Sequence, residues 1–430
     1  MAEPPGTRQL LALTAAAFLV LAAEPLYVLV DTAVVGHLGS LQLGALGLGG
    51  TLLSLVAMLG GFLDYATTAR AARWFGAGER DRAIDEGVAA SVLALGVGVV
   101  AVALGEIFSR PLLDLLAGGP GALEAAAQHW FRIAVLGVPG ILLALAGNGW
   151  MRGVQDTRRP VRIVLAANAM SAVASPVLVY VIGLGLVGSA VANLAAQAFA
   201  GTLFLFALRA QRRPWWPPPG VLAAYLVPAK DLLLRKAGLQ AAMLAASGVA
   251  ARMGTAQVAA HQIGFECWSF AALLLDSFAI AAQSLVGAAL GGGDTASARQ
   301  IAWRVARYGL AAGIVLGAVL AGGWYVIPPV FTSSGAVVTQ VHVLWPFLAS
   351  MQPAAGVVFA LDGVLIGAGD VRYMRDLTLV ATVGVYVPIG IASLQLQWGI
   401  GGLWAGLAAS IVVRLIGMLR RTSGERWSVA

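Results

Sequence analysis

The sequence predicts an all-α polytopic membrane protein with twelve transmembrane helices, arranged as two six-helix lobes related by a parallel internal repeat. Of its 430 residues, 59% are hydrophobic and 11% are charged, whereas soluble proteins carry about 25% charged residues. Only helices and closed barrels can cross a bilayer, because every backbone polar group must be paired internally. The apolar runs are long and continuous rather than alternating, which favours helices over a barrel.

Twelve apolar runs are long enough to cross a membrane, since a spanning helix needs about 20 residues. The start of the seventh run is open, because it could reach back to Leu222 past four charged residues. The expected spans are Leu10–Val35, Leu43–Ala69, Ile84–Phe108, Ala122–Ala146, Val161–Ile182, Leu186–Leu208, Ala237–Ala251, Gln262–Ala289, Val305–Val330, Val341–Ile366, Leu377–Leu396 and Gly399–Met418.

The basic residues predict the orientation of these spans. If both termini are cytoplasmic, only Arg110, Arg132 and Arg252 among the 27 Lys and Arg residues lie on the outer side, as the positive-inside rule requires. We therefore expect a bacterial cytoplasmic membrane protein with both termini in the cytoplasm. The net charge of +7 does not indicate nucleic-acid binding, because the arginines lie in short clusters between the apolar runs.

The two halves share short motifs in the same order. Six helices per half is an even number, so the second copy enters the membrane from the same side as the first, which predicts a parallel repeat. We expect an N-lobe at 1–208, a Pro-rich cytoplasmic linker at 209–221 and a C-lobe at 222–430. The matched segments, roughly 214 to 224 residues apart, are Thr32–His37 with Thr255–His261, Phe75–Glu79 with Leu290–Asp294, and Asn148–Asp156 with Asp362–Asp370.

Acids within the spans are the leading candidates for a functional site, because each costs roughly 3 kcal/mol or more to insert. Asp31 follows Pro25, a residue that removes a helix hydrogen bond, and a carboxylate in apolar surroundings can bind and release a proton. A bound sodium ion at Asp31 would instead keep it ionised. Asp31 could also make only a structural hydrogen bond. Glu24 lies two turns earlier and is either a relay to Asp31 or a partner for backbone groups freed by Pro25.

Further polar residues could line a substrate cavity. Each has an ordinary alternative: Asp64 could pair with Arg70 or Arg73, the amides could join neighbouring helices, and Tyr27 could simply pack. The candidates are Asp276, Asp362, Glu266, Gln283, Asp64, Asn168, Asn193 and Tyr27.

The motifs resemble the multidrug and toxic compound extrusion (MATE) transporters, in their DNA-damage-inducible F (DinF-like) branch. The segments that carry the likeness are Pro25–Gly39, Asn148–Pro160, Gly254–Gln262, Ala282–Asp294 and Leu361–Asp370. The resemblance implies twelve helices in two lobes and export of amphipathic, often cationic compounds against protons or sodium. It also implies a coupling role for Asp31. Some members carry a second acid in the fifth helix, where this chain has Ser175.

We therefore expect a secondary active transporter rather than an enzyme: a cation-coupled antiporter, with a proton favoured over sodium, that works by alternating access. No cofactor is expected beyond the coupling ion, and no resident metal site, since the chain has a single cysteine, Cys267, and no His-Cys zinc spacing. The expected partners are the bilayer and a small organic substrate, without nucleic acid, for a monomeric chain. A lipid-linked precursor flippase of the same superfamily and a membrane-embedded lipid-modifying enzyme are the alternatives.

Overall fold

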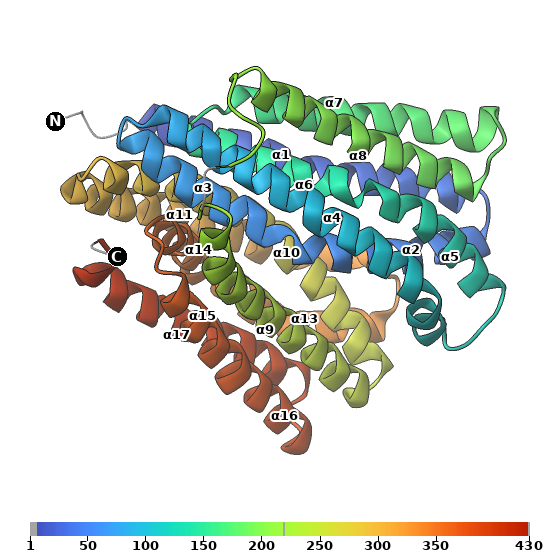
Figure 1. Cartoon of the computed structure of the whole chain (residues 1–430). Coiled ribbons are helices and arrows are strands. Elements are labelled where there is room, and N and C mark those ends of the chain that lie inside the picture. The colour runs from blue at the N-terminus through green and yellow to red at the C-terminus, as the bar shows by residue number, and fades with distance from the viewer. Residues whose placement is uncertain (1–6, 218–219, 429–430) are drawn as a thin grey trace. The chain divides into compact units, whose positions relative to one another are not determined.

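A computed structural model of the chain describes residues 7–217 and 220–428, and within these ranges the secondary structure is helical with no strand (Figure 1). The outermost parts of the expected lobes, at 1–6 and 429–430, and residues 218–219 of the expected linker lie outside the described residues.

Twelve membrane-spanning helices account for this part of the chain. Ten are long and apolar enough to span a membrane on their own, and an eleventh is formed by two helices that meet at 50°. The N-terminal six are α1 (Thr7–Gly36), α2 with α3 (Ser40–Leu59, Gly61–Gly76), α4 (Arg80–Ala117), α5 with α6 (Ala122–Ala134, Val138–Gly153), α7 (Arg158–Pro176) with a π-helical turn at Val177–Val181, and α8 (Leu186–Arg209).

The remaining helices repeat this order. They are α9 (Ala223–Met253), α10 (Thr255–Gly291), α11 (Thr295–Gly322) with the short α12 (Ile327–Phe331), the bent pair α13 and α14 (Gly335–Ser350, Gln352–Gly367), α15 with α16 (Val371–Ala381, Val387–Gln395) around a π-helical turn at Thr382–Tyr386, and α17 (Gly399–Ser423). The expected fold class is confirmed.

Helix α9 is the twelfth helix and the least apolar one. It begins at Ala223 and is 31 residues long, which settles the open start of the seventh span. Its first half carries four charged residues, and two of them have buried partners. The Asp231 carboxylate accepts a hydrogen bond from Arg375 at 2.5 Å, and the Arg235 guanidinium pairs with Asp362. The charges that lower the hydropathy of α9 are therefore neutralised inside the protein.

The chain forms two compact units. The N-unit is Leu19–Ala229, and the C-unit is Met1–Phe18 together with Lys230–Ala430. The start of α1 belongs to the C-unit because Leu10 and Leu13 are buried in its core. This division by packing differs from the expected boundaries at 208 and 222, and the lobes as moving parts stay a prediction.

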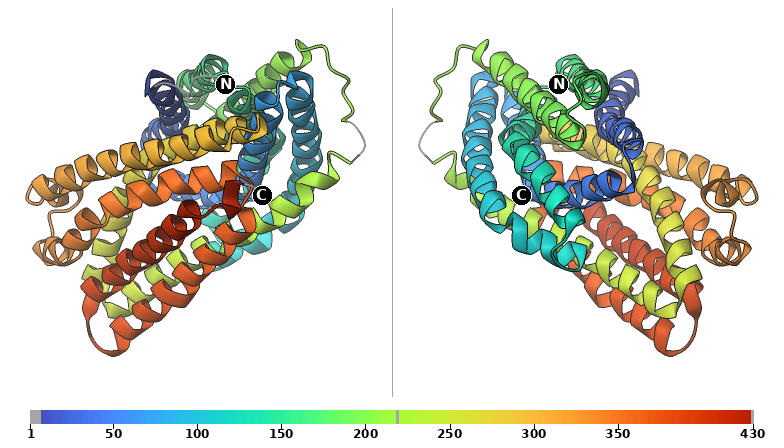
Figure 2. Two further views of the ribbon diagram at one scale, coloured as in Figure 1. Left: turned by 90° about the vertical axis from the view of Figure 1, so that its left-hand side faces the viewer. Right: turned by 90° about the vertical axis from the view of Figure 1, so that its right-hand side faces the viewer.

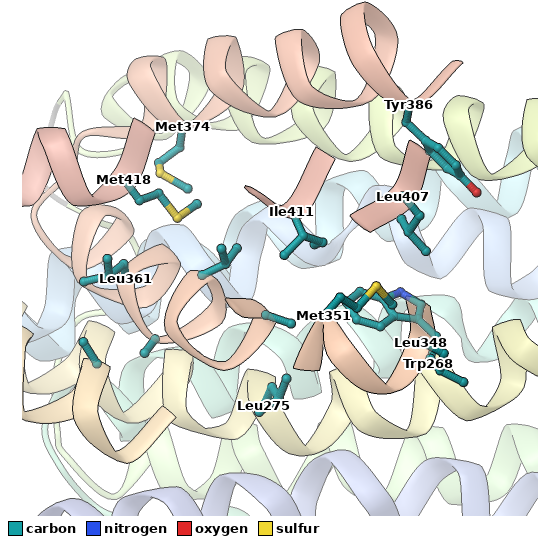
Figure 3. Close-up of a cluster of buried hydrophobic side chains, with 14 of the residues drawn as sticks. Trp268, Leu275, Leu348, Met351, Leu361, Met374, Tyr386, Leu407, Ile411 and Met418 are labelled. Carbon is teal, nitrogen blue, oxygen red and sulfur yellow. The ribbon is translucent and has the colours of Figure 1, made fainter. Parts of the chain in front are cut away.

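The same arrangement organises both units. In the N-unit α6 packs against α3, α4 and α8, and in the C-unit α14 packs against α10, α11 and α17. Helices α16 and α17 lie side by side at the end of the chain (Figure 2). In the core of the C-unit, Met374 and Met418 lie beside each other, and Trp268 lies close to Leu348 and Met351 at the bend between α13 and α14 (Figure 3).

Backbone geometry gives the register of the repeat. Gly39 before α2 has φ 132° and ψ 171°, and Gly254 before α10 has φ 137° and ψ 170°. A Cβ on Gly39 would meet the side-chain oxygen of Gln42, and one on Gly254 would meet that of Gln257. The two segments are thus equivalent, at a separation of 215 residues.

One predicted sequence match is therefore wrong. In the register of Gly39 and Gly254, Thr32–His37 is not equivalent to Thr255–His261. His37 is exposed after the end of α1, whereas His261 is buried inside α10. A short run of small residues around Thr and Ala is common in membrane helices, so it carries little information about register.

The other two matches agree with that register, and close helix contacts recur at equivalent positions. Glycines allow the backbones of two helices to approach closely, and each such contact in the N-unit has a counterpart in the C-unit. The pairs are Gly98–Pro139 with Gly313–Pro353, Gly149–Asp64 with Gly363–Ala279, and Gly153–Thr68 with Gly367–Gln283.

Replacing Gly363 with alanine is expected to destabilise the C-unit. A Cβ at this position would lie 1.9 Å from the carbonyl oxygen of Ala279 on α10, so α10 and α14 must separate, at a cost of about 1–3 kcal/mol or more. Gly248→Ala in α9 is the control, because a Cβ there has open space. The measurement is the thermal unfolding temperature in detergent, and equal temperatures for the two variants would contradict this packing.

Candidate functional site: a buried carboxylate between α1, α7 and α8

Asp31 is the centre of a polar cluster in the N-unit. Its side chain on α1 is buried, with the residue 3% exposed. The Ser175 hydroxyl on α7 donates a hydrogen bond to one carboxylate oxygen at 2.6 Å, and the Ser189 hydroxyl on α8 donates to the other at 2.7 Å. Both oxygens of the acid are thus held by hydroxyl groups from two other helices.

A second layer of polar groups continues the cluster. The Trp130 indole N–H on α5 donates to the Ser189 hydroxyl at 3.1 Å. One turn before Asp31 on α1, the Tyr27 hydroxyl accepts a hydrogen bond from Asn193 Nδ2 at 3.2 Å. The Asn193 Oδ1 atom is buried and accepts no hydrogen bond from any residue in the described ranges.

The helix that carries Ser175 changes its geometry directly afterwards. Pro176 is the last residue of α7, and it has no backbone N–H to donate. The chain continues as a π-helical turn over Val177–Val181, a rare geometry that is frequent at functional sites. Tyr180 in this turn donates a hydrogen bond to the carbonyl of Val34 on α1, so α7 and α1 are joined on both sides of Asp31.

The partners of Asp31 can serve both of its protonation states. A serine hydroxyl is a donor and an acceptor, and its hydrogen can rotate. An ionised carboxylate accepts from both serines, whereas a protonated one can donate to either of them. The site can thus gain or lose a proton without leaving a buried polar group unpaired.

Part of this cluster was predicted from the sequence. Asp31, Tyr27, Asn193 and the serine in place of a second acid were singled out, and the structure brings them together. Ser189 and Trp130 were missed, because nothing near them in the sequence points to a partner that is 158 or 59 residues away.

Two other predicted residues of α1 lie on the surface of the described chain. Glu24 and Pro25 are exposed, and α1 continues as one helix through Pro25. The relay from Glu24 to Asp31 stays a prediction. Asn168 on α7 donates its side-chain amide to the carbonyl of Val164 at 3.0 Å, a bond within its own helix.

Asp64 takes part in a buried ion pair, but with a different partner from the two considered. The Arg152 guanidinium on α6 donates to both oxygens of Asp64 on α3, at 2.8 and 3.1 Å. Arg70, one of the expected partners, instead pairs with Glu86 at 2.7 and 2.8 Å. The charge of Asp64 is therefore balanced within the N-unit.

Asp362 is balanced by two arginines in the C-unit. Arg235 on α9 donates to both carboxylate oxygens at 2.5 and 2.6 Å, and Arg414 on α17 donates at 3.0 Å. The side chains of all three are at most 12% exposed. The sequence suggested an acidic cavity wall that attracts cations, but this cluster carries two positive charges and one negative charge.

The remaining candidates are spread along α10. Glu266 is exposed and accepts a hydrogen bond from Gln262 at 2.8 Å. Asp276 is half-buried and Gln283 is buried. Within the described parts of the chain, no group of three or more His, Cys, Asp or Glu side chains is placed to hold a metal ion.

The twelve helices in two repeated halves and the buried acid in an otherwise apolar helix define a polytopic membrane transporter. The MatE family model matches the chain twice, over residues 16–181 and 236–391. The chain therefore belongs to the MATE family of transporters, and both its resemblance to the family and its repeat are confirmed.

Known relatives agree with this assignment. The chain is 31% identical to Protein DETOXIFICATION 44, chloroplastic, of Arabidopsis thaliana, over 95% of this chain and 80% of the relative. It is 30% identical to the DNA damage-inducible protein F of Escherichia coli strain K12, over 91% of this chain and 86% of the relative. A crystal structure of a MATE protein in the bent conformation shares the fold, with a TM-score of 0.90 at 20% identity, covering 98% of this chain and 97% of that one.

Proposed function

We propose that the chain is a proton-coupled antiporter that exports amphipathic, cationic organic compounds by alternating access. Asp31 is the group that binds the coupling proton. The observation that carries the proposal is the pair of serine hydroxyls on the two oxygens of this buried acid. They can satisfy the charged and the neutral carboxylate equally, which is what a proton carrier needs. At 2.6–2.7 Å they also occupy positions that a sodium ion would have to share.

The proposal extends to the setting of the protein. It acts as a monomer in the bacterial cytoplasmic membrane, with both termini in the cytoplasm, and its partners are the lipid and the exported compound. The distribution of arginines supports this orientation. The Arabidopsis relative is named a detoxification protein, which supports a toxic organic compound as the substrate.

Proteoliposomes with separately imposed ion gradients test the coupling ion. We expect a proton gradient alone to drive accumulation of cationic dyes against their gradient, and a sodium gradient of the same size at equal pH to drive none. Transport that follows sodium and ignores the proton gradient would overturn the proton assignment. Movement of lipid-linked precursors without any dye transport would favour the flippase alternative instead.

A further inference from the structure

A basic groove lies along the first turns of α11. The hollow has a volume of about 430 Å³ and is lined by Arg299, Gln300, Trp303, Arg304 and Arg307. These positions recur every three or four residues, so they form one face of the helix. Trp303 and Arg307 are exposed. The Glu425 carboxylate, which is itself exposed, accepts a hydrogen bond from Arg299 at 3.2 Å, and three guanidinium groups against one carboxylate leave the groove positive.

The groove lies where a membrane helix meets the lipid head groups. Helix α11 has 28 residues and is about 42 Å long, which exceeds the hydrocarbon core of about 30 Å. Its start is fixed by Asp294, which accepts hydrogen bonds from the backbone N–H and the hydroxyl of Ser297 at 2.8 and 2.7 Å. These bonds hold the pKa of Asp294 below its usual range. Side chains on a helix lean toward its N-terminus, so Arg304 and Arg307 reach back toward the aqueous boundary.

The same face becomes apolar and open beyond the groove. Leu310, Ala311 and Ile314 follow Arg307 on this face, and all three are exposed. The chemistry along α11 thus runs from a positive, hydrogen-bonding end to an apolar surface. A phospholipid with an anionic head group and acyl chains has the complementary order.

The repeat provides an internal comparison. At a separation of 215 residues, the positions equivalent to Gln300, Trp303 and Arg304 are Asp85, Val88 and Ala89 of α4. These residues are buried, and Asp85 is neutralised by Arg213 at 2.6–2.8 Å. The fold itself therefore requires neither arginines nor an open groove on this face. Both are specific to α11.

We propose that the groove on α11 binds an anionic phospholipid, with the phosphate between Arg304 and Arg307 and an acyl chain along Leu310 and Ile314. Arginines that face a membrane surface attract anionic lipids, and the planar guanidinium suits phosphate oxygens. The exposed Trp303 fits the same interface, where tryptophan is enriched. The site rests on α11 spanning the membrane and is independent of what the protein exports.

The test compares lipid binding by the purified full-length chain in detergent, using native mass spectrometry and thermal unfolding. Phosphatidylglycerol is expected to remain bound and to raise the unfolding temperature, whereas phosphatidylcholine is not. In Arg304→Gln/Arg307→Gln the affinity for phosphatidylglycerol should fall on the order of tenfold to thirtyfold. The matched control is Arg80→Gln/Arg82→Gln at the start of α4, the repeat-related helix, which should bind the lipid as the wild type does.

Several outcomes would overturn the proposal. They are unchanged affinity in the α11 variant, an equal loss in the α4 control, equal binding of phosphatidylcholine, and stabilisation by millimolar inorganic phosphate as strong as that by the lipid, which would indicate a free-phosphate site. If the double variant fails to fold, the exposed single substitution Arg307→Gln should still weaken binding severalfold. Because transport is not measured, failure here leaves the proposed export function untouched.

Discussion

Asp31→Asn is expected to reduce proton-driven export to the level of vesicles that lack the protein. Asparagine has nearly the same shape, and its amide can still hydrogen-bond to Ser175 and Ser189, which now hold the carboxylate at 2.6 and 2.7 Å. It cannot gain or lose a proton in this range of pH, so the step that links the ion to the substrate is lost while the cluster stays filled. The measurement is dye accumulation in proteoliposomes under an imposed proton gradient.

A second acid near a membrane boundary provides the control. Glu106 on α4 pairs with Arg132 at 2.6 Å, and the arginine side chain is 59% exposed. Exposed pairs contribute little to stability, so Glu106→Gln should export as the wild type does. Equal unfolding temperatures would show that Asp31→Asn is folded. Wild-type export by the folded Asp31→Asn variant would exclude Asp31 as the coupling group.

The sequence was sufficient for the helices because apolar length is a one-dimensional property. The run expected at Ile84–Phe108 lies within α4 at Arg80–Ala117, and most other runs agree as well. The start of α9 was hidden for a physical reason. Asp231 and Arg235 look like loop residues in the sequence, and only their partners Arg375 and Asp362, more than 120 residues away, explain how a helix can bury them.

The site was only half visible in the sequence. Asp31 could be singled out because an acid in an apolar helix is expensive wherever it lies. Its partners could not, because a serine in a membrane helix is common, and which serine faces Asp31 depends on the rotation of α7 and α8. The same limit applies to Asp362, which was taken for a cavity acid until the positions of Arg235 and Arg414 were known.

Asp362→Asn is expected to destabilise the C-unit by about 3–5 kcal/mol, because it leaves two buried guanidinium groups without a carboxylate. The arginine side chains are 12% and 8% exposed, and the Arg414 Nε atom already lacks a hydrogen-bond partner among the described residues. The measurement is unfolding in detergent. Asp376→Asn is the control, because that acid is 62% exposed in its pair with Arg375 and should cost less than about 1 kcal/mol.

The repeat suggests how to rescue this variant. The positions equivalent to Arg235, Asp362 and Arg414 in the first half are Val20, Asn148 and Ala200, so the same fold accommodates an uncharged set there. The triple variant Arg235→Val/Asp362→Asn/Arg414→Ala removes all three charges together, and replacing a buried ion cluster as a whole is often neutral or stabilising. We expect it to recover most of the stability lost by Asp362→Asn. A triple variant less stable than Asp362→Asn would show that the arginines stabilise the C-unit through contacts other than the carboxylate.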